Sequence, residues 1–187
     1  MRVIAGTARS TPLCTPSGMD TRPTTDRIKE TLFNILQFSL RDRPFLDLFA
    51  GSGAMGIEAL SRGASYAVLI DASREAADCI RKNLAKCHFE QRAELLQTDV
   101  SSGLFRIAGR RELRSPLVFM DPPYDKGLEL PALSALMQSG LLTEESIVVV
   151  ETSLSGNLSA AEGLGYEVFR EKKYKNQKHV FLRIQNA

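Results

Sequence analysis

Residues 117–124, with the sequence LVFMDPPY, hold the side chains of this chain that are best placed to do chemistry. Four apolar residues of strand type lead to Asp121, and the two prolines that follow prevent further strand or an immediate helix. Open α/β sheets bind their ligands at the carboxyl ends of strands, which is where this aspartate is expected. The segment therefore indicates either an acidic residue that faces a ligand or a plain proline turn closed by an exposed tyrosine.

A second group of candidate residues follows a predicted strand at residues 45–50. The sequence GSGAMG from Gly51 to Gly56 has the spacing of a tight turn that opens a helix and allows a ligand close to the backbone. Asp71 ends the next predicted strand, twenty residues after Gly51, where such folds place a carboxylate that binds ribose. Together these features predict a nucleoside ligand.

Both candidate sites depend on strands and helices that alternate along the chain. Strands are predicted at residues 45–50, 66–70, 93–97, 117–120 and 146–150, and a hairpin at residues 166–173 and 178–184. Helices are predicted within residues 22–36, with Thr24 or Thr25 as the N-cap, and at residues 54–61, 73–86, 131–140 and 156–163. One irregular helix is predicted at residues 101–115. Residues 1–23 contain five Gly and Pro residues and are expected to form an arm outside the core, with short strands at residues 2–5 and 13–15.

The segment RPTTDR, residues 22–27, lies at the start of the first predicted helix. It brings Arg22, Thr24, Thr25 and Arg27 together at a helix N-terminus, where backbone N–H groups and the helix dipole attract anions. These residues are candidates for contact with a carboxylate or with an RNA phosphate. The alternative is that they simply cap the helix.

Length and composition fit one ordinary globular domain. The chain has 187 residues, of which 43% are hydrophobic and 25% charged, and it has no apolar run long enough to span a bilayer, so a cytoplasmic protein is expected. Its three cysteines lack C-x-x-C spacing and there are only two histidines, which argues against a disulfide framework or a zinc site. We therefore expect reduced bystander thiols and no metal.

The net charge of +2 is unevenly distributed. Residues 1–43 carry +3, residues 44–169 carry −6 and residues 170–187 carry +5. If both basic ends meet on one face, they would suit a phosphate backbone. Otherwise they are a solvated arm and tail.

The sequence DPPY at residues 121–124 resembles the D/N-P-P-Y/F/W signature of S-adenosylmethionine-dependent amino-methyltransferases. An aryl amine is a poor nucleophile and must be held nearly tetrahedral before it can attack a methyl group. The resemblance implies that the Asp121 carboxylate and the Pro122 carbonyl accept its two N–H bonds, while Tyr124 stacks on an unstacked base. Asp121 would act as a carboxylate, so it needs no raised pKa.

Residues 47–53, with the sequence DLFAGSG, resemble motif I of class I methyltransferases, whereas nicotinamide-dependent enzymes usually have an apolar residue in place of Asp47. The resemblance implies that Asp47 helps hold the charged methionine end of S-adenosylmethionine, that Asp71 takes both ribose hydroxyls and that Asp99 accepts from the adenine amino group. Gly51, Gly53 and Val100 complete the set of cofactor-binding residues. Asp71 and Asp99 could instead be a helix N-cap or a loop carboxylate.

Taken nearly from end to end, the chain resembles the bacterial RsmD family, through residues 4–6, RPTTDR, LFNIL at residues 32–36, motif I, Asp71, Asp99 and DPPY. This family methylates the N2 amine of one guanine in the 16S ribosomal RNA of the small subunit, or of its late assembly intermediate. The resemblance implies a Rossmann-like class I fold of α/β type: a seven-stranded, mostly parallel sheet with helices on both faces and a C-terminal antiparallel hairpin. Residues 1–43 would pack as an arm and helix on a methyltransferase domain at residues 44–187.

Three other functions fit parts of the sequence. An adenine-N6 DNA methyltransferase shares DPPY but usually has a DNA-recognition region for which this chain has no room, so DNA is not expected as a partner. A membrane is not expected either, because no apolar run is long enough to span one. A nicotinamide-dependent oxidoreductase would explain the glycine turn but not Asp47. A non-catalytic RNA-binding assembly factor would keep the fold without the reaction. The early arm of the RsmD family is often richer in basic residues, whereas the sequence TARST at residues 7–11 has only Arg9. This stretch is therefore expected to add little RNA affinity.

Overall fold

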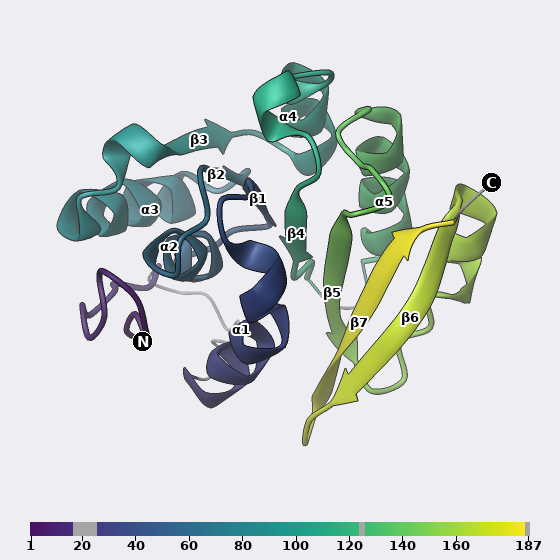
Figure 1. Ribbon diagram of the computed structural model, residues 1–187, viewed down its shortest axis with the longest axis horizontal. Coiled ribbons are helices and arrows are strands. Elements are labelled where there is room, and N and C mark those ends of the chain that lie inside the picture. Colours follow the sequence, from purple (N-terminus) through teal and green to yellow (C-terminus); the bar gives the residue numbers. More distant parts are fainter. Residues whose placement is uncertain (17–25, 124–125, 186–187) are drawn as a thin grey trace.

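Seven strands form one sheet in the order β3-β2-β1-β4-β5-β7-β6 (Figure 1). The computed structural model describes residues 1–16, 26–123 and 126–185. The first five strands are parallel, and β7 and β6 continue the sheet as an antiparallel hairpin. The strands are β1 (Phe45–Leu48), β2 (Ala67–Asp71), β3 (Ala93–Gln97), β4 (Leu117–Met120), β5 (Ile147–Ser153), β6 (Tyr166–Lys173) and β7 (Gln177–Ile184).

Helices cover both faces of this sheet, as Figure 1 shows. The α-helices are α1 (Asp26–Leu40), α2 (Ala54–Ser61), α3 (Arg74–Cys87), α4 (Val100–Ile107) and α5 (Glu129–Gln138), and the 3₁₀ helices are η1 (Glu90–Arg92), η2 (Arg111–Leu113) and η3 (Ser159–Leu164). One face packs against α1, α2 and α3 and the other against α4, α5 and η3. In the described part of the chain, every helix is too short or too polar to cross a membrane.

The predicted sheet and its hairpin are confirmed, and the main corrections concern the two irregular regions. The irregular helix predicted at residues 101–115 ends at Ile107, and a short 3₁₀ turn follows Gly109, whose φ is +71°. The two short strands predicted in the arm do not form as strands. Their segments are joined by one bridge, between Arg2 and Pro12, and by a few backbone hydrogen bonds on either side of it. The arm is also not outside the core, since Val3 and Leu13 are buried against α2 and α3.

A buried ion pair explains why the arm docks. Glu58 on α2 is fully buried and accepts hydrogen bonds from the backbone N–H groups of Ile4 at 2.8 Å and Ala5 at 3.1 Å. Lys29 on α1 is 1% exposed, and its Nζ lies 3.3 Å from the same carboxylate. Its Nζ also donates to the Arg2 carbonyl at 2.6 Å. One carboxylate therefore ties the arm, α1 and α2 together.

We predict that Gly6→Ala destabilises the protein more than the same change at Gly140. Both glycines have a positive φ, +84° and +69°, but a Cβ on Gly6 would lie 1.8 Å from the Ser61 carbonyl oxygen, whereas one on Gly140 meets nothing within 4 Å. The left-handed backbone alone costs about 1–2 kcal/mol, so Gly140→Ala isolates that cost. Urea unfolding of both variants measures the difference, and equal losses would contradict the close approach of the arm to α2.

Candidate active site

The glycine turn between β1 and α2 is built around two carboxylates on neighbouring strands. Asp71, at the end of β2, accepts from the Gly51 N–H at 2.7 Å and from the Ser73 N–H at 2.8 Å. Gly51 and Gly53 both have positive φ, +55° and +74°. A Cβ on Gly53 would press on Leu69 at 2.9 Å, whereas space beside Gly51 is open for 4 Å. Gly53 therefore serves helix packing, and Gly51 leaves its backbone accessible.

Asp47 lies beneath this turn rather than in the open. It is 1% exposed and accepts from the Gly56 N–H, in the first turn of α2, at 2.8 Å. Burial, with a smaller repulsion from Asp71, raises its pKa to about 8. Asp47 thus fixes the start of α2 against the sheet. Because the carboxylate is buried, little of it is accessible to a ligand.

We predict that Asp47→Asn flattens the dependence of stability on pH. Because the folded state raises this pKa to about 8 from 3.8, the folded state binds a proton that the unfolded state has lost, and wild-type stability falls as pH rises between these values. The slope from one such group is at most about 1.4 kcal/mol per pH unit. Asparagine keeps an acceptor for Gly56 but does not titrate. Urea unfolding at pH 5 and pH 8 measures this. The unfolding free energy of the variant, relative to that of the wild type, should be higher at pH 8 than at pH 5, and an equal difference at both pH values would contradict the raised pKa.

Asp99 and Val100 lie at the start of α4, just after the end of β3. Asp99 is exposed and is the N-cap of α4, accepting from the Ser102 N–H at 2.9 Å, and this hydrogen bond lowers its pKa. Val100 is buried in the core beneath. The N-cap role is one of the two that the sequence left open for Asp99. Its exposed position at the carboxyl edge also leaves it accessible to a ligand.

Asp121 follows β4 directly at the carboxyl edge of the sheet, beside the end of β1. It is half-buried, and no hydrogen bond or ion pair to its carboxylate occurs among the described residues. Burial, reinforced by the charges of Glu151 and Asp47, raises its pKa well above the usual range. This shift was not expected from the sequence, because the charges that cause it come from other strands. Pro122 is buried beside it.

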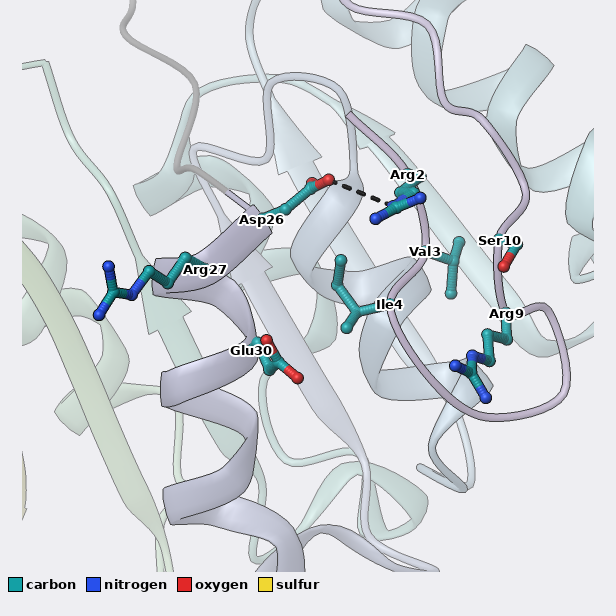
Figure 2. A pocket seen from close by; sticks show the side chains of 8 residues that line it. All are labelled: Arg2, Val3, Ile4, Arg9, Ser10, Asp26, Arg27 and Glu30. Atoms are coloured by element: carbon teal, nitrogen blue, oxygen red, sulfur yellow. Dashed lines mark ion pairs between the residues drawn. The ribbon is translucent and has the colours of Figure 1, made fainter.

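The other predicted substrate-binding residues are only partly described. Tyr124, Arg22, Thr24 and Thr25 lie outside the described residues. Arg27, in the first turn of α1, is exposed and lines a cavity of about 310 Å³ between α1 and the arm. Figure 2 shows Arg27 pointing away from the arm, while Arg2, paired with Asp26 at 3.5 Å, and Arg9 approach the cavity from the arm itself.

Buried polar side chains of the hairpin were missed by the sequence analysis. Glu151 on β5 is 2% exposed and accepts from Gln177 Nε2 at 2.5 Å, and its other oxygen is 2.8 Å from His179 Nε2. His179 is fully buried, and its Nδ1 lies 3.1 Å from the Tyr174 hydroxyl. The acidic residue after an apolar run was a signal for Glu151, but its partners could be found only from the pairing of β5 with β7.

Two of the three cysteines lie close together. All three are free thiols, yet the Sγ atoms of Cys14 in the arm and Cys79 on α3 lie 3.1 Å apart. Asn83 joins them, since its Nδ2 donates to the Cys14 carbonyl at 3.0 Å and to the Ser52 carbonyl of the glycine turn at 2.9 Å. The arm thereby supports the glycine turn. Among the described residues, no three His, Cys, Asp or Glu side chains group as metal ligands would.

Comparisons with known proteins agree with the resemblance found in the sequence. Residues 1–183 match a family model described as "Conserved hypothetical protein 95". The ribosomal RNA small subunit methyltransferase D of Escherichia coli K12 is 36% identical over 172 residues, which cover 92% of this chain and 84% of that protein.

Solved structures support the same relationship. The Escherichia coli protein yhhF, provisionally described as a methyltransferase, is 32% identical to this chain with a TM-score of 0.80. The match covers 100% of this chain and 99% of that chain. A precorrin-6y C5,15-methyltransferase from Geobacter metallireducens shares the fold alone, at 18% identity and a TM-score of 0.64 over 93% of this chain and 94% of that one. The predicted Rossmann-like class I fold is thus confirmed, and the chain belongs to the family of the ribosomal RNA small subunit methyltransferase D proteins.

Proposed function

We propose that this protein transfers a methyl group from S-adenosylmethionine to the exocyclic N2 of one guanine in the 16S ribosomal RNA of the small subunit. The observation that carries the proposal is the position of Asp121 at the sheet edge beside the glycine turn, where its carboxylate makes no hydrogen bond or ion pair with the described residues. Membership of a family that includes ribosomal RNA methyltransferases supports the substrate. Ribosomal subunits are assembled in the cytoplasm, which is the proposed location.

The residues around the glycine turn fit S-adenosylmethionine. Space beside Gly51 admits a ligand to the backbone, and Asp71 keeps free lone pairs for ribose hydroxyls after accepting from two N–H groups. Asp99 lies exposed at the next strand end, where an adenine would reach. We assign Asp47, Gly51, Gly53, Asp71, Asp99 and Val100 to this ligand, with Asp47 acting mainly through the turn that it supports.

At the neighbouring strand end, Asp121 and the Pro122 carbonyl would accept the two N–H bonds of the guanine amine. Fixing both bonds turns the nitrogen lone pair toward the methyl group, so the rate gain comes from orientation and preorganised charge. Tyr124 is proposed to stack on the base, and Arg22, Thr24, Thr25 and Arg27 to border the base and its phosphates.

We propose that the basic C-terminal hairpin makes most of the contacts with RNA phosphates. β7 begins opposite the end of β5, since Gln177 pairs with Ser153, so the hairpin turn lies at the same sheet edge as Asp121. Lys172 and Lys173 are exposed beside this turn. The first turn of α1, with the exposed Arg27, reaches this edge too, because α1 leads directly into the start of β1. We therefore propose that Arg27, near one basic end, and the lysines of the hairpin, near the other, flank the candidate site.

We predict that replacing both Lys172 and Lys173 with glutamine weakens RNA binding and flattens its salt dependence. Each lost phosphate contact should reduce the slope of log K against log salt by about 0.7–0.9. Binding titrations at several salt concentrations, with the double variant Arg111→Gln/Arg114→Gln as the matched control for removing two exposed charges, test this assignment. An unchanged slope in the lysine variant would contradict it.

Incorporation of tritiated methyl groups tests the proposed function. Small ribosomal subunits from a strain that lacks this protein should accept one methyl group per particle from the purified protein and S-adenosylmethionine. Calorimetry with S-adenosylmethionine and with a nicotinamide dinucleotide tests the choice of ligand. Binding of S-adenosylmethionine without incorporation of methyl groups would favour a non-catalytic assembly factor. Incorporation of methyl groups into DNA alone would favour an adenine-N6 DNA methyltransferase.

A further inference from the structure

The sheet register places a row of ionisable side chains on one face at the carboxyl edge. Asp47 pairs with Phe119 in register, and Met120 pairs with Val150, so the next residues, Asp121 and Glu151, follow side by side. His179 pairs with Glu151 across the next strand. Since side chains alternate along a strand and in-register neighbours share a face, all of these side chains project toward α1. Apolar residues of the same face, Phe119, Val149 and Phe181, lie below them in the core.

Glu151 is oriented more tightly than its neighbour. Gln177 and His179 hold its two oxygens at 2.5 and 2.8 Å, and His179 is itself held by the Tyr174 hydroxyl at 3.1 Å and by edge contact with the Phe119 ring, 5.9 Å between centroids. Such support for a carboxylate that is 2% exposed fixes its position beside Asp121. Two carboxyl groups that share a site do not both ionise readily, so a proton between them is stabilised.

We propose that Asp121 and Glu151 act as a carboxyl pair that receives and shares the proton released from the target nitrogen, with His179 and Gln177 positioning Glu151. The inference rests on the proposed function and adds a step to it. As the N–C bond forms, the S–C bond breaks and its electron pair stays on sulfur. The nitrogen, now bearing a positive charge, loses one N–H proton to Asp121, and the pair releases that proton to solvent when the product leaves.

The surroundings of the pair favour this role. The charged or titratable groups that face the pair from the elements around it include Asp47 on β1, groups on the helices, and groups on β6 and the turn after it. On the helices these are Arg27 and Lys29 of α1 and Glu58 of α2, with Arg62 just after α2. On β6 and its turn they are Arg170, Lys172 and Tyr174, and Lys172 pairs in register with His179. Glu58 pairs with both Lys29 at 3.3 Å and Arg62 at 2.7 Å, so these three charges offset one another in one network. Burial, with the charge of Glu151, raises the pKa of Tyr174 to about 12, so its hydroxyl stays neutral. The raised pKa of Asp121, caused by burial and then by Glu151, agrees with a shared proton.

The pH profile of single-turnover methyl transfer tests the pair. With S-adenosylmethionine saturating, Glu151→Gln should move the acid limb of the profile about one pH unit lower, because one negative charge beside Asp121 is lost. Its plateau rate should also fall. Glu151→Asp keeps the charge and should retain the wild-type limb, and Glu167→Gln, at the other end of the hairpin, is the matched control.

Carbon-13 NMR of the Asp121 carboxyl in the wild-type protein gives a measurement that needs no variant to fold. A coupled pair should titrate in two steps with the upper one well above the usual aspartate range, whereas a single step near pH 4 would overturn the proposal. An acid limb that stays in place in folded Glu151→Gln would also overturn it. Absence of transfer by the wild-type protein at every pH would instead contradict the proposed function.

Discussion

Asp121→Asn is expected to lower the single-turnover rate of methyl transfer by at least about 10²–10³-fold, the usual loss when one preorganised group at the reacting centre is removed. Asparagine keeps the size of the side chain but turns one acceptor oxygen into an N–H donor, which repels an amine hydrogen. The target nitrogen then loses both its orientation and its proton acceptor. Because Asp121 has no hydrogen-bond partner among the described residues, the change should leave the fold intact.

Binding of S-adenosylmethionine separates this effect from a general disturbance of the site. Calorimetry of the Asp121→Asn protein should give nearly the wild-type dissociation constant, since the residues assigned to that ligand lie on β1, β2 and β3 and their turns. Asp71→Asn is the matched comparison. It should weaken that binding, because one of the two oxygens that accept from the Gly51 and Ser73 N–H groups becomes a donor. Equal transfer rates for wild-type and Asp121→Asn proteins would contradict the assigned role.

Glu58→Ala is expected to cost about 3–5 kcal/mol of unfolding free energy, the usual range when one partner of a buried ion pair is removed. Lys29 would keep its buried ammonium group with only the Arg2 carbonyl as a close partner, and the N–H groups of Ile4 and Ala5 would lose their acceptor. The arm should then detach more readily. Hydrogen exchange at Ile4 and Ala5 should rise together with the loss of stability measured by urea unfolding.

An exposed ion pair provides the control for that prediction. Glu167 pairs with Arg183 on the hairpin surface at 2.9 Å, and both side chains are about half exposed, so Glu167→Ala should leave stability almost unchanged. If Glu58→Ala were as mild as Glu167→Ala, the carboxylate would not be what fastens the arm to α1 and α2.

The sequence predicts the parts of this protein that depend on local patterns. Apolar runs located the five parallel strands and the hairpin, and the residues that end those runs, Asp71 and Asp121, lie at the carboxyl edge as expected. Glycine spacing located the turn before α2. Such features depend on residues close in the chain, where periodicity and turn chemistry are informative.

Features that depend on strand register or on burial of charge were not predictable in the same way. Whether Glu151 meets His179 depends on which hairpin strand pairs with β5, and no local pattern states that β7 does so. Lys29 belongs by its type to a solvent-facing position, and only the three-dimensional packing of Glu58 reveals its buried partner. The packed arm was missed because irregular segments rich in Gly and Pro have no periodicity from which burial can be inferred.

Identification of the methylated nucleoside is the most direct test that this protein methylates guanine N2 in ribosomal RNA. Small subunits from a strain that lacks this protein would be treated with the purified protein and isotopically labelled S-adenosylmethionine, and their RNA digested to nucleosides for mass spectrometry. We expect label in N2-methylguanosine at one site of the 16S RNA, and none when the Asp121→Asn protein is used. Label in N6-methyladenosine, or no label in RNA at all with the wild-type protein, would contradict it.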